Sequence, residues 1–366
     1  MRTGPTFVLL IVGLVVGGVV GHFVIAPESG GEMAATEESA SGLGAPVRWK
    51  MASSFAATMP ILGPSIMTFL DNLETVSAGN MQIKFYEPGA LVPALEVFDA
   101  VSSGSVDVGF STPGFWAGKE PALQLFAAVP FGPAQAEYMA FYYDGGGKEM
   151  LDELYAAHNI KGHLCGLFAP EASGWFREEI KGPEDLKGLK MRFFALGAKV
   201  MEKLGVSTQL LAPGDIFPAL ELGTIDATEL ASPAIDRNLG FYQIAKHYYF
   251  PGWHQQSTWV ELMVNLDKWN SLTPAQQRVF EITCGDMVRM TIAMGEADQV
   301  PALEFLAGEG VQFHRWSPEM LALFESGWNE VVAEEVAKDE KFAAAWTLLS
   351  EFRTRYAIWR ELGYLN

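Results

Sequence analysis

Two stretches of this chain read as copies of one structural unit. They are EVFDAVSSGSVDVGFST at 96–112 and DIFPALELGTIDATELA at 215–231. Each combines a short apolar-periodic helix, a Gly where that helix ends, a β-branched strand start and a Pro shortly afterwards. The repeat distance exceeds the roughly 20 to 50 residues of a solenoid, so it predicts two similar α/β lobes, an arrangement that usually holds a small ligand between them. Because helix-Gly-strand is a common local pattern, chance similarity stays open as the alternative.

The two copies differ at the residue that ends the strand. This residue is Phe110 in the first copy and Glu229 in the second. In open α/β sheets, ligands bind beyond the carboxyl ends of the strands. We therefore expect a cleft with an aromatic wall from one lobe and a carboxylate from the other. Two further strands are expected to end at this face, at 53–55 and at 192–194.

Alternating apolar segments predict an α/β fold in which helices wrap mainly parallel sheets. We assign 46–157 to lobe 1 and 158–265 mainly to lobe 2, and the strand expected at 259–265 could return to either lobe. From Thr273 onward the pattern is helical, so 266–366 is expected to form long helices that pack on both lobes. The other elements expected are strands at 47–53, 81–86, 106–110 and 190–194, and helices at 60–77 and 198–204.

The N-terminal region predicts export from the cytoplasm. Phe7–Ala26 is an apolar run interrupted only by His22, about as long as a bilayer span and longer than the apolar core of most signal peptides. Residues 1–26 are therefore either a cleaved signal peptide or a retained membrane anchor. Residues 27–45 have the composition of a flexible linker. Both readings predict a periplasmic globular part, either released or tethered to the inner membrane.

The exported part is strongly acidic. The chain has a formal net charge of −19, and residues 1–26 contribute one basic residue, Arg2, and no acidic one. There is no block of Lys and Arg, so nucleic acid and anionic membrane surfaces are poor partners, and an anionic ligand needs a specific cation. Cys165 and Cys284 either pair in an oxidising compartment or remain two buried thiols.

Four motifs occur in order along the chain: AVPFG at 128–132, GWFR at 174–177, PEDLKGLKMR at 183–192 and GTIDATE at 223–229. Together they resemble the DctP-type extracytoplasmic solute receptors of TRAP transporters. The resemblance extends over about residues 46 to 350. It implies a two-lobe fold like that of periplasmic binding proteins, with a hinge and a ligand cleft that closes over a small organic acid. It also implies delivery of this acid to the membrane permease subunits, and a binding protein rather than an enzyme.

The resemblance also implies roles for individual residues. Arg192, at the end of the LKGLKMR run, would clamp the ligand carboxylate, because a planar guanidinium matches a carboxylate in two parallel hydrogen bonds. The chain is similar to a subgroup of 2-oxo acid and lactate receptors that place a metal ion beside the ligand. The metal positions carried over from this subgroup are Glu171, Glu229 and Gln255. The chain departs from the subgroup pattern at Glu171, where a Gln is familiar, and at Leu230, where a Trp is familiar.

The charge balance of this site favours Ca²⁺ over Na⁺. Arg192, a monocarboxylate, Glu171 and Glu229 leave two negative charges, whose burial would cost several kcal/mol or force a proton onto a Glu. A Ca²⁺ ion balances these charges, whereas Na⁺ leaves one, and both ions accept hard oxygen ligands. If Glu171 points to solvent instead, Na⁺ or no metal is equally suitable.

Aromatic residues near the strand ends are candidates for the apolar side of the cleft. They are Phe55, Phe110, Phe193 and Trp253, and core packing is the alternative for each. His254 either donates a hydrogen bond to a keto or hydroxyl oxygen of the ligand or is an exposed loop residue. One cationic clamp in an aromatic cleft favours a monocarboxylic 2-oxo or 2-hydroxy acid over a dicarboxylate, which would need a second cation.

Two rival functions remain. An enzyme is disfavoured because HExxH, GxSxG and a complete P-loop are absent from the sequence, and because a zinc site at His158, His163 and Cys165 would need a further partner or a water. A sensory receptor subunit of the same fold would instead signal to a membrane kinase. The C-terminal helix could also form a homodimer or pack back on its own lobes, with an apolar face that comprises Trp346, Phe352, Tyr356 and Trp359.

Overall fold

The computed structural model describes residues 42–365, and residues 43–365 belong to one compact unit. The expected signal peptide or anchor at 1–26 and the expected linker up to residue 41 lie outside the described residues. The end of that linker is bound to the globular part. Thr273 Oγ1 donates a hydrogen bond to the Leu43 carbonyl and Gln276 Nε2 donates one to the Ala45 carbonyl, each at 2.8 Å. Within 42–365, no helix has both the length and the apolar character needed to cross a bilayer.

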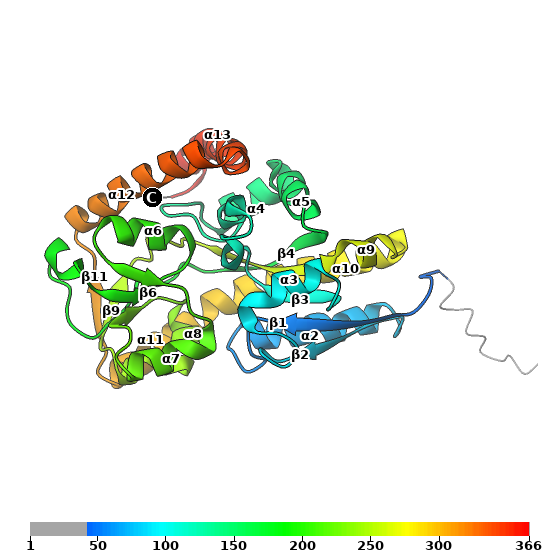
Figure 1. Ribbon diagram of the computed structural model, residues 1–366, viewed down its shortest axis with the longest axis horizontal. Helices are drawn as coiled ribbons and strands as arrows, with labels where there is room; N and C mark the ends of the chain where they lie inside the picture. Colours follow the sequence, from blue (N-terminus) through cyan, green and yellow to red (C-terminus); the bar gives the residue numbers. More distant parts are fainter. Residues whose placement is uncertain (1–41, 366) are drawn as a thin grey trace, which may run out of the picture. The chain divides into compact units, whose positions relative to one another are not determined.

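The described chain contains two β-sheets, each flanked by helices (Figure 1). The strand order is β2-β1-β3-β10-β4 in the first sheet and β11-β9-β5-β8-β6-β7 in the second. The mixed α/β fold predicted from the sequence is confirmed. The first sheet comprises β1 (Val47–Ser53), β2 (Met81–Tyr86), β3 (Val108–Ser111), β4 (Ile160–Phe168) and β10 (Thr258–Asn265). The second comprises β5 (Gly174–Phe176), β6 (Lys190–Arg192), β7 (Ser207–Gln209), β8 (Ala227–Thr228), β9 (His247–Phe250) and β11 (Gln312–Arg315).

Both sheets have the same internal plan. Strand β1 pairs in parallel with β2 and β3, and β6 pairs in parallel with β7 and β8. The next strand is antiparallel in each sheet, β10 beside β3 and β5 beside β8. The chain reaches β5 from the first sheet through residues 169–173, and β10 from the second sheet through 251–257. We call these segments the first and second crossovers.

Hydrogen bonds join the two crossovers to each other. The Glu171 N–H donates to the Gln255 carbonyl at 3.1 Å, and the Gly252 N–H donates to the Glu171 carbonyl at 3.0 Å. Residues far apart in the sequence therefore meet where the chain passes between the sheets.

The repeated unit is present twice in the structure. It consists of α3 (Val97–Ser102) with β3, and of α7 (Pro213–Glu221) with β8. The Gly after each helix has a positive φ, 75° in the first copy and 69° in the second. The Asp before each strand accepts a hydrogen bond from the parallel neighbour of that strand. Asp107 accepts from the Lys50 N–H of β1 at 2.8 Å, and Asp226 accepts from the Lys190 N–H of β6 at 3.0 Å. These matched contacts confirm the prediction that the chain builds one unit twice.

Helices from the last third of the chain pack beside both sheets. Helix α12 (Pro318–Lys338) packs on α6 (Ala195–Lys203), which contacts β7 of the second sheet. Helix α13 (Glu340–Gly363) packs on α4, α5 and η4 beside the first sheet. The remaining bounds are α2 (Leu62–Val76), η2 (Ala94–Glu96), η3 (Pro113–Trp116), η4 (Pro121–Phe126), α4 (Gln135–Asp144), α5 (Gly147–Ala156), η5 (Pro183–Leu186), α8 (Pro233–Leu239), η6 (Phe241–Gln243), α9 (Leu266–Asn270), α10 (Pro274–Ala297) and α11 (Gln299–Gly308).

The placement of β4 differs from the expectation. Residues 158–168 were expected in lobe 2, but β4 pairs along its whole length with β10 in the first sheet. The strand expected at 259–265, which could have joined either lobe, also lies in this sheet. A buried strand reads as a continuous apolar run whichever sheet it joins, so only its pairing partner decides its place. Strands β7, β9 and β11 were not expected from the sequence.

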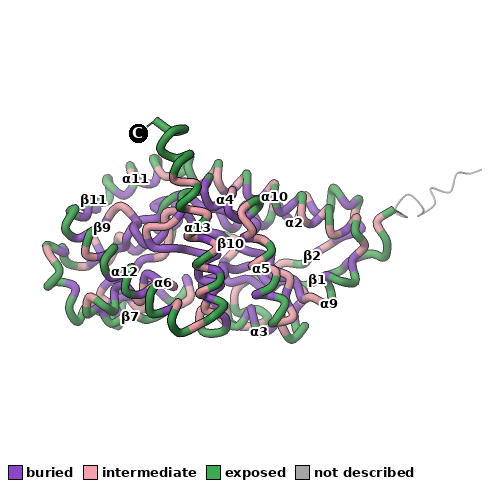
Figure 2. Tube along the Cα trace, turned by 90° about the horizontal axis from the view of Figure 1, so that it is seen from above, coloured by how far each residue is buried: buried purple, intermediate pink, exposed green. Residues whose placement is uncertain are grey.

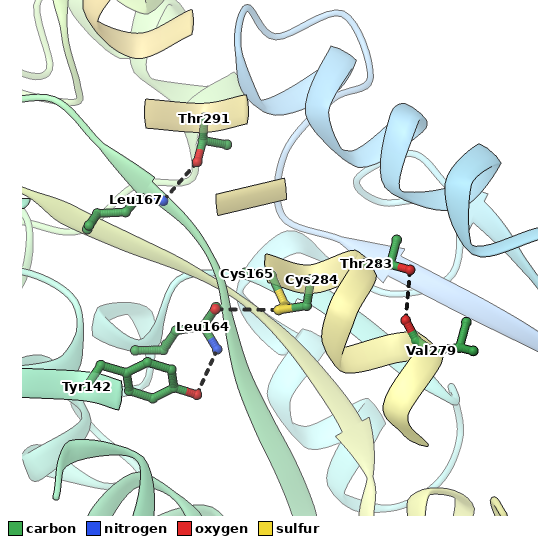
Figure 3. Close-up of a disulfide and its surroundings, with 8 residues drawn as sticks. All are labelled: Tyr142, Leu164, Cys165, Leu167, Val279, Thr283, Cys284 and Thr291. Carbon is green, nitrogen blue, oxygen red and sulfur yellow. Dashed lines mark hydrogen bonds between the residues drawn. A yellow bond between two sulfur atoms is a disulfide. The ribbon is translucent and has the colours of Figure 1, made fainter. Parts of the chain in front are cut away.

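A disulfide between Cys165 and Cys284 ties β4 to α10 (Figure 3). Close to it, the Leu167 N–H of β4 donates a hydrogen bond to Thr291 Oγ1 of α10 at 3.0 Å. The two cysteines therefore form a disulfide and are not two separate buried thiols. The disulfide also removes Cys165 as a zinc ligand, and the neighbouring His163 is buried between Trp269 and Phe280.

Candidate functional site

A cavity lies between the two sheets, beyond the carboxyl ends of their parallel strands. Most of its lining residues follow β1, β3, β6 and β8 or belong to the two crossovers, which agrees with the position predicted for the cleft, and Phe168 of β4, Pro213 of α7 and Thr258 and Val260 of β10 also line it. The cavity contains about 550 Å³ of space not filled by atoms, part of it open to solvent. Its polar lining comprises Thr112, Glu171, Arg192, Ser232, Gln255 and Thr258.

Arg192 is the last residue of β6 and lines the cavity, although its side chain is only 1% exposed. Its Nη1 donates hydrogen bonds to the main-chain carbonyl and to Oε1 of Glu229, both at 2.8 Å. Its Nε donates to the Leu211 carbonyl at 3.3 Å. These three bonds fix the orientation of the guanidinium. Its contact with a ligand carboxylate stays a prediction.

Glu229 follows β8 directly and is completely buried. Its Oε1 accepts from Arg192, and its Oε2 lies 3.5 Å from Nε2 of His254. Burial raises the pKa of Glu229, but the positive charge of Arg192 and the proximity of His254 outweigh burial, so this pKa lies below its ordinary value. His254 is itself only 1% exposed, which excludes the alternative that it is an exposed loop residue without a role in binding.

Glu171 lies in the first crossover and contacts Gln255 of the second crossover and Thr258, the first residue of β10. Its Oε1 accepts hydrogen bonds from Thr258 Oγ1 at 2.8 Å and from Gln255 Nε2 at 3.3 Å. The side chain is buried and lines the cavity, which rules out the possibility that it points to solvent. Burial and the negative charge of Glu229 hold the pKa of Glu171 well above its ordinary value.

The unpartnered polar atoms of this site fit a bound cation. Within the described part of the chain, Glu171 Oε2, Glu229 Oε2 and Gln255 Oε1 are buried without a hydrogen-bond partner, as are both ring nitrogens of His254. One potential ligand atom from each of Glu171, Glu229 and His254 lies within 4.8 Å of the other two. A buried acceptor without a partner costs free energy, and oxygen ligands suit Ca²⁺ and Na⁺ better than ring nitrogen does. Glu171, Glu229 and Gln255 would therefore hold such an ion.

Three of the aromatic candidates pack against other rings and do not line the cavity. Phe110 packs edge-on against Phe55 at 5.5 Å between ring centroids, and Phe55 lines the cavity. Phe193 packs against His254 at 4.9 Å, and Trp253 stacks on Phe324 at 4.6 Å. None of these three lines the cavity, so their expected role as wall residues is corrected to packing in the core. The aromatic side chains that line it are Phe55, Phe115, Phe168 and Phe194.

The difference between Phe193 and Phe194 follows from the geometry of an extended chain. Successive side chains in such a segment point to opposite sides, and a pair of adjacent phenylalanines does not reveal which one faces a cavity. In the first sheet, Phe110 lies within β3 and is packed in the core, and the cavity is lined instead by Phe115 of η3.

Asp236 in α8 is a buried acid that the sequence analysis missed. Its Oδ2 accepts hydrogen bonds from Trp175 Nε1 at 2.9 Å and from Tyr248 OH at 2.8 Å, and these two rings stack at 3.7 Å. Burial raises the pKa of Asp236 to about 7, although both hydrogen bonds lower it. Trp175 of the GWFR motif thus packs inside the second sheet and does not line the cavity. The available signal was an acid that directly follows the apolar PAI segment at the start of α8.

Known proteins share both the sequence and the fold of this chain. Residues 52–339 match the family described as bacterial extracellular solute-binding protein, family 7, or DctP. The monocarboxylate 2-oxoacid-binding periplasmic protein of Nostoc sp. strain PCC 7120 is 33% identical over 324 residues, which cover 87% of this chain and 88% of that protein.

Two solved structures are similar over most of the chain. A TRAP transporter solute-binding protein from Bordetella bronchiseptica RB50 has a TM-score of 0.85 and 34% identity, covers 87% of this chain and 95% of its own, and carries copurified calcium and picolinate. A TRAP periplasmic solute-binding protein from Pseudoalteromonas atlantica T6c, with bound sodium and pyruvate, has a TM-score of 0.83 and 29% identity and covers 87% and 97%. All of these relatives are solute-binding proteins, so the prediction of a receptor rather than an enzyme is confirmed. The chain therefore belongs to family 7 of the bacterial extracellular solute-binding proteins, the extracytoplasmic solute receptors of TRAP transporters.

Proposed function

We propose that this receptor captures a small 2-oxo or 2-hydroxy monocarboxylate together with a Ca²⁺ or Na⁺ ion and delivers the acid to a TRAP permease. The observation that carries this proposal is the convergence of Arg192, Glu171 and Gln255 on one cavity, with Glu229 buried beside Arg192. The ligands of the relatives support it, because the Nostoc protein is named for 2-oxo acids and the two solved relatives hold an organic acid with a metal ion.

Each polar residue has a separate task in this proposal. Arg192 holds the ligand carboxylate with the part of its guanidinium that Glu229 leaves free. Gln255 and Thr258 hold Glu171 in position through their hydrogen bonds. The bound cation supplies the positive charge that two buried carboxylates and an anionic ligand require.

Charge balance favours Ca²⁺ within this proposal. Arg192 and Glu229 form an ion pair that neutralises itself. Glu171 and a monocarboxylate then leave two negative charges in a buried site, which one divalent ion balances. Na⁺ would leave one charge uncompensated, so we propose Ca²⁺ in preference to Na⁺.

The sheets with their helices are proposed to be the two lobes that close over the ligand. Residues from both sheets line the cavity, and the two hydrogen-bonded crossovers pass between them. Closure around a ligand requires a few residues that absorb the change in backbone angles, and the crossovers are the segments placed to do so.

Calorimetry after removal of the metal tests the proposed function. The purified protein is dialysed against a chelator and titrated with pyruvate or lactate, with and without added Ca²⁺ or Na⁺. We expect Ca²⁺ to tighten binding at least about tenfold, since it removes an uncompensated charge. Equal affinity without any added ion would end the cation proposal. Failure of every 2-oxo and 2-hydroxy acid tested to bind would overturn the function itself.

Family membership places the protein outside the cytoplasm. We further propose that residues 1–26 are retained as an anchor, in which case the protein fractionates with inner membranes and keeps its N-terminal Met–Arg sequence. Recovery of the protein in the soluble periplasmic fraction with an N-terminus near residue 27 would show cleavage instead.

A homodimer through α13 is also proposed. Trp346 and Phe352 pack within their own chain, against Trp328 and Phe141. The last turns of α13 are exposed and stand out from the buried core (Figure 2), and Trp359 is 58% exposed there. An apolar helix end of this kind suits a second copy. Light scattering should give twice the monomer mass, and the change Trp359→Glu should restore the monomer; a monomeric wild type would exclude the dimer.

A further inference from the structure

We infer that Ser232 is a ligand-binding residue whose hydroxyl group donates a hydrogen bond to an oxygen of the bound acid, and that Gln299 holds this hydroxyl as a donor. The inference rests on the proposed function, in which a small organic acid occupies the cavity beside Arg192. Ser232 lies between β8 and α8, is 3% exposed and lines the cavity. Its role follows from the hydrogen bonds around it.

Ser232 directly precedes α8, at the N-cap position, but its side chain does not cap this helix. A serine at an N-cap usually accepts a hydrogen bond from the second or third N–H of its helix. Here the Ala234 N–H, the second of α8, donates instead to Oε1 of Gln299, the first residue of α11, at 3.1 Å. Gln299 therefore replaces Ser232 as the cap and leaves the hydroxyl group available to other partners.

Two main-chain groups fix the orientation of the Gln299 amide. The Ala234 N–H can only donate, so the amide atom that it meets is the oxygen. The Gly295 carbonyl can only accept, so the amide atom that it meets is Nε2. Nε2 donates its other hydrogen to Ser232 Oγ at 3.1 Å. Because Ser232 accepts in this bond, its own proton must point toward a different acceptor.

The other two hydroxyl groups of the cavity lining already use their protons within the protein. Thr112 Oγ1 donates to the Trp259 carbonyl, and Thr258 Oγ1 donates to Oε1 of Glu171, each at 2.8 Å. Within residues 42–365, the bond from Gln299 is the one hydrogen bond that involves Ser232 Oγ, and Ser232 is the acceptor in it. Of the three hydroxyl groups, Ser232 is thus the one whose proton is available to a ligand.

A free donor in the wall of this cavity favours an oxygen of the ligand. A buried hydroxyl group without an acceptor costs free energy relative to one in water, and a ligand oxygen removes that cost. Keto, hydroxyl and carboxylate oxygens all accept hydrogen bonds, whereas an ammonium group only donates. The wall at Ser232 therefore suits an oxygen of a 2-oxo or 2-hydroxy acid and disfavours an ammonium group in the same place.

Calorimetry on two serine variants tests this inference. Ser232→Ala and Ser65→Ala remove the same hydroxyl group, and Ser65 is also buried but lies in α2 outside the cavity lining. Each protein is titrated with pyruvate and with lactate in the presence of Ca²⁺. We expect Ser232→Ala to weaken binding about three- to tenfold, the usual effect of losing one hydrogen bond, and Ser65→Ala to leave the Kd unchanged.

The two proposals fail in different ways in this experiment. Equal affinities of Ser232→Ala and the wild type would overturn the role of Ser232 and leave the proposed function intact. A wild type that binds neither acid would contradict the proposed function itself.

A second variant separates ligand binding from a structural effect. Gln299→Glu replaces the amide nitrogen with an oxygen, which accepts the Ser232 proton and draws it away from the ligand. Ser232→Ala should therefore have no further effect on the Kd in the Gln299→Glu background. The effect of the added negative charge is the same with and without the hydroxyl group, so it cancels in this comparison. A loss on Ser232→Ala that is equally large in both backgrounds would contradict the role of Gln299.

Discussion

Phe110 and Glu229 occupy matched positions of the two repeated units but have different roles. The Phe110 carbonyl accepts a hydrogen bond from the Ser54 N–H after β1, and the Glu229 N–H donates one to the Arg192 carbonyl of β6, so each residue is bonded to the neighbouring parallel strand or its end. Phe110 is packed in the core, whereas Glu229, which occupies the corresponding place, forms a buried ion pair. The scaffold is therefore duplicated, while the polar chemistry belongs to the second copy.

Arg192→Lys should weaken ligand binding at least about tenfold. Lysine keeps the positive charge beside Glu229 but lacks the planar fork that can bond Glu229 and a ligand carboxylate together. The measurement is the calorimetric Kd for the 2-oxo acid found to bind. Arg237→Lys, at a side chain beside Phe305 and outside the cavity lining, serves as the control. A full-affinity Arg192→Lys variant would contradict the clamp.

Glu261→Gln should change how the stability of the protein depends on pH. Glu261 is fully buried in β10, where Trp116 Nε1 donates to it at 2.7 Å and Tyr155 OH also donates to it. Burial raises its pKa from 4.5 to about 7. Below 4.5 both the folded and the unfolded states are protonated at this group. As the pH rises to about 7, the unfolded chain loses its proton first, so the wild type loses up to about 3 kcal/mol of stability.

The variant has no such proton and should not show this loss. Urea unfolding of both proteins at about pH 5 and about pH 8 measures it, because the other groups titrate equally in both and cancel in the comparison. The free energy of unfolding of Glu261→Gln should therefore rise relative to the wild type between these two pH values. A difference that does not change with pH would show that Glu261 is ionised throughout.

Among the elements, η3 and the segment after β6 form a contact between the two walls of the cavity. Phe194 packs over Gly114 of η3, and a Cβ atom placed on Gly114 would lie 2.3 Å from the Phe194 ring. The contact thus requires a residue without a side chain at this point of η3. It joins an element beside the first sheet to the end of a strand in the second.

Gly114→Ala should hinder closure and weaken ligand binding about tenfold, because overpacking of a close contact costs about 1–3 kcal/mol. Gly118→Ala is the matched control, since no atom lies within 4 Å of a Cβ at that position. Calorimetry gives the affinities, and small-angle scattering with ligand reports whether the molecule becomes compact. Unchanged affinity of Gly114→Ala would show that this contact does not limit closure.

At the level of the whole molecule, ion pairs attach the C-terminal helices to both sheets. Lys199 of α6 pairs with Glu335 of α12 at 2.5 Å. Lys341 of α13 pairs with Glu120 at 2.6 Å, and Arg353 pairs with the buried Glu137 at 3.1 Å. The joint between α12 and α13 therefore lies between a helix held by the second sheet and a helix held by the first. Together with the crossovers, it is a further covalent path between the proposed lobes.

Removal of the disulfide should lower the stability of the whole molecule without altering the cavity. Cys165 and Cys284 are 119 residues apart, and a cross-link of this span typically contributes about 2–4 kcal/mol by restricting the unfolded chain. Cys165→Ala with Cys284→Ala should reduce the free energy of unfolding by this amount and leave the ligand Kd within a few-fold. A reductant should lower the stability of the wild type and have no effect on the double variant. Equal stability of reduced and oxidised wild type would contradict the prediction.

Local patterns along the chain were sufficient for the repeated unit, the alternation of strands and helices, the position of the cleft and the identity of Arg192 as a strand-end cation. These features depend on neighbouring residues and on motifs that are continuous in the sequence. The tertiary structure decided the sheet to which β4 belongs, the pairing of Cys165 with Cys284, and the choice of Phe194 over Phe193 at the cavity wall. Each of these depends on contacts between distant segments. The residues next to a buried strand or a cysteine do not show which segment it pairs with, and the residues next to two adjacent phenylalanines do not show which of them faces the cavity.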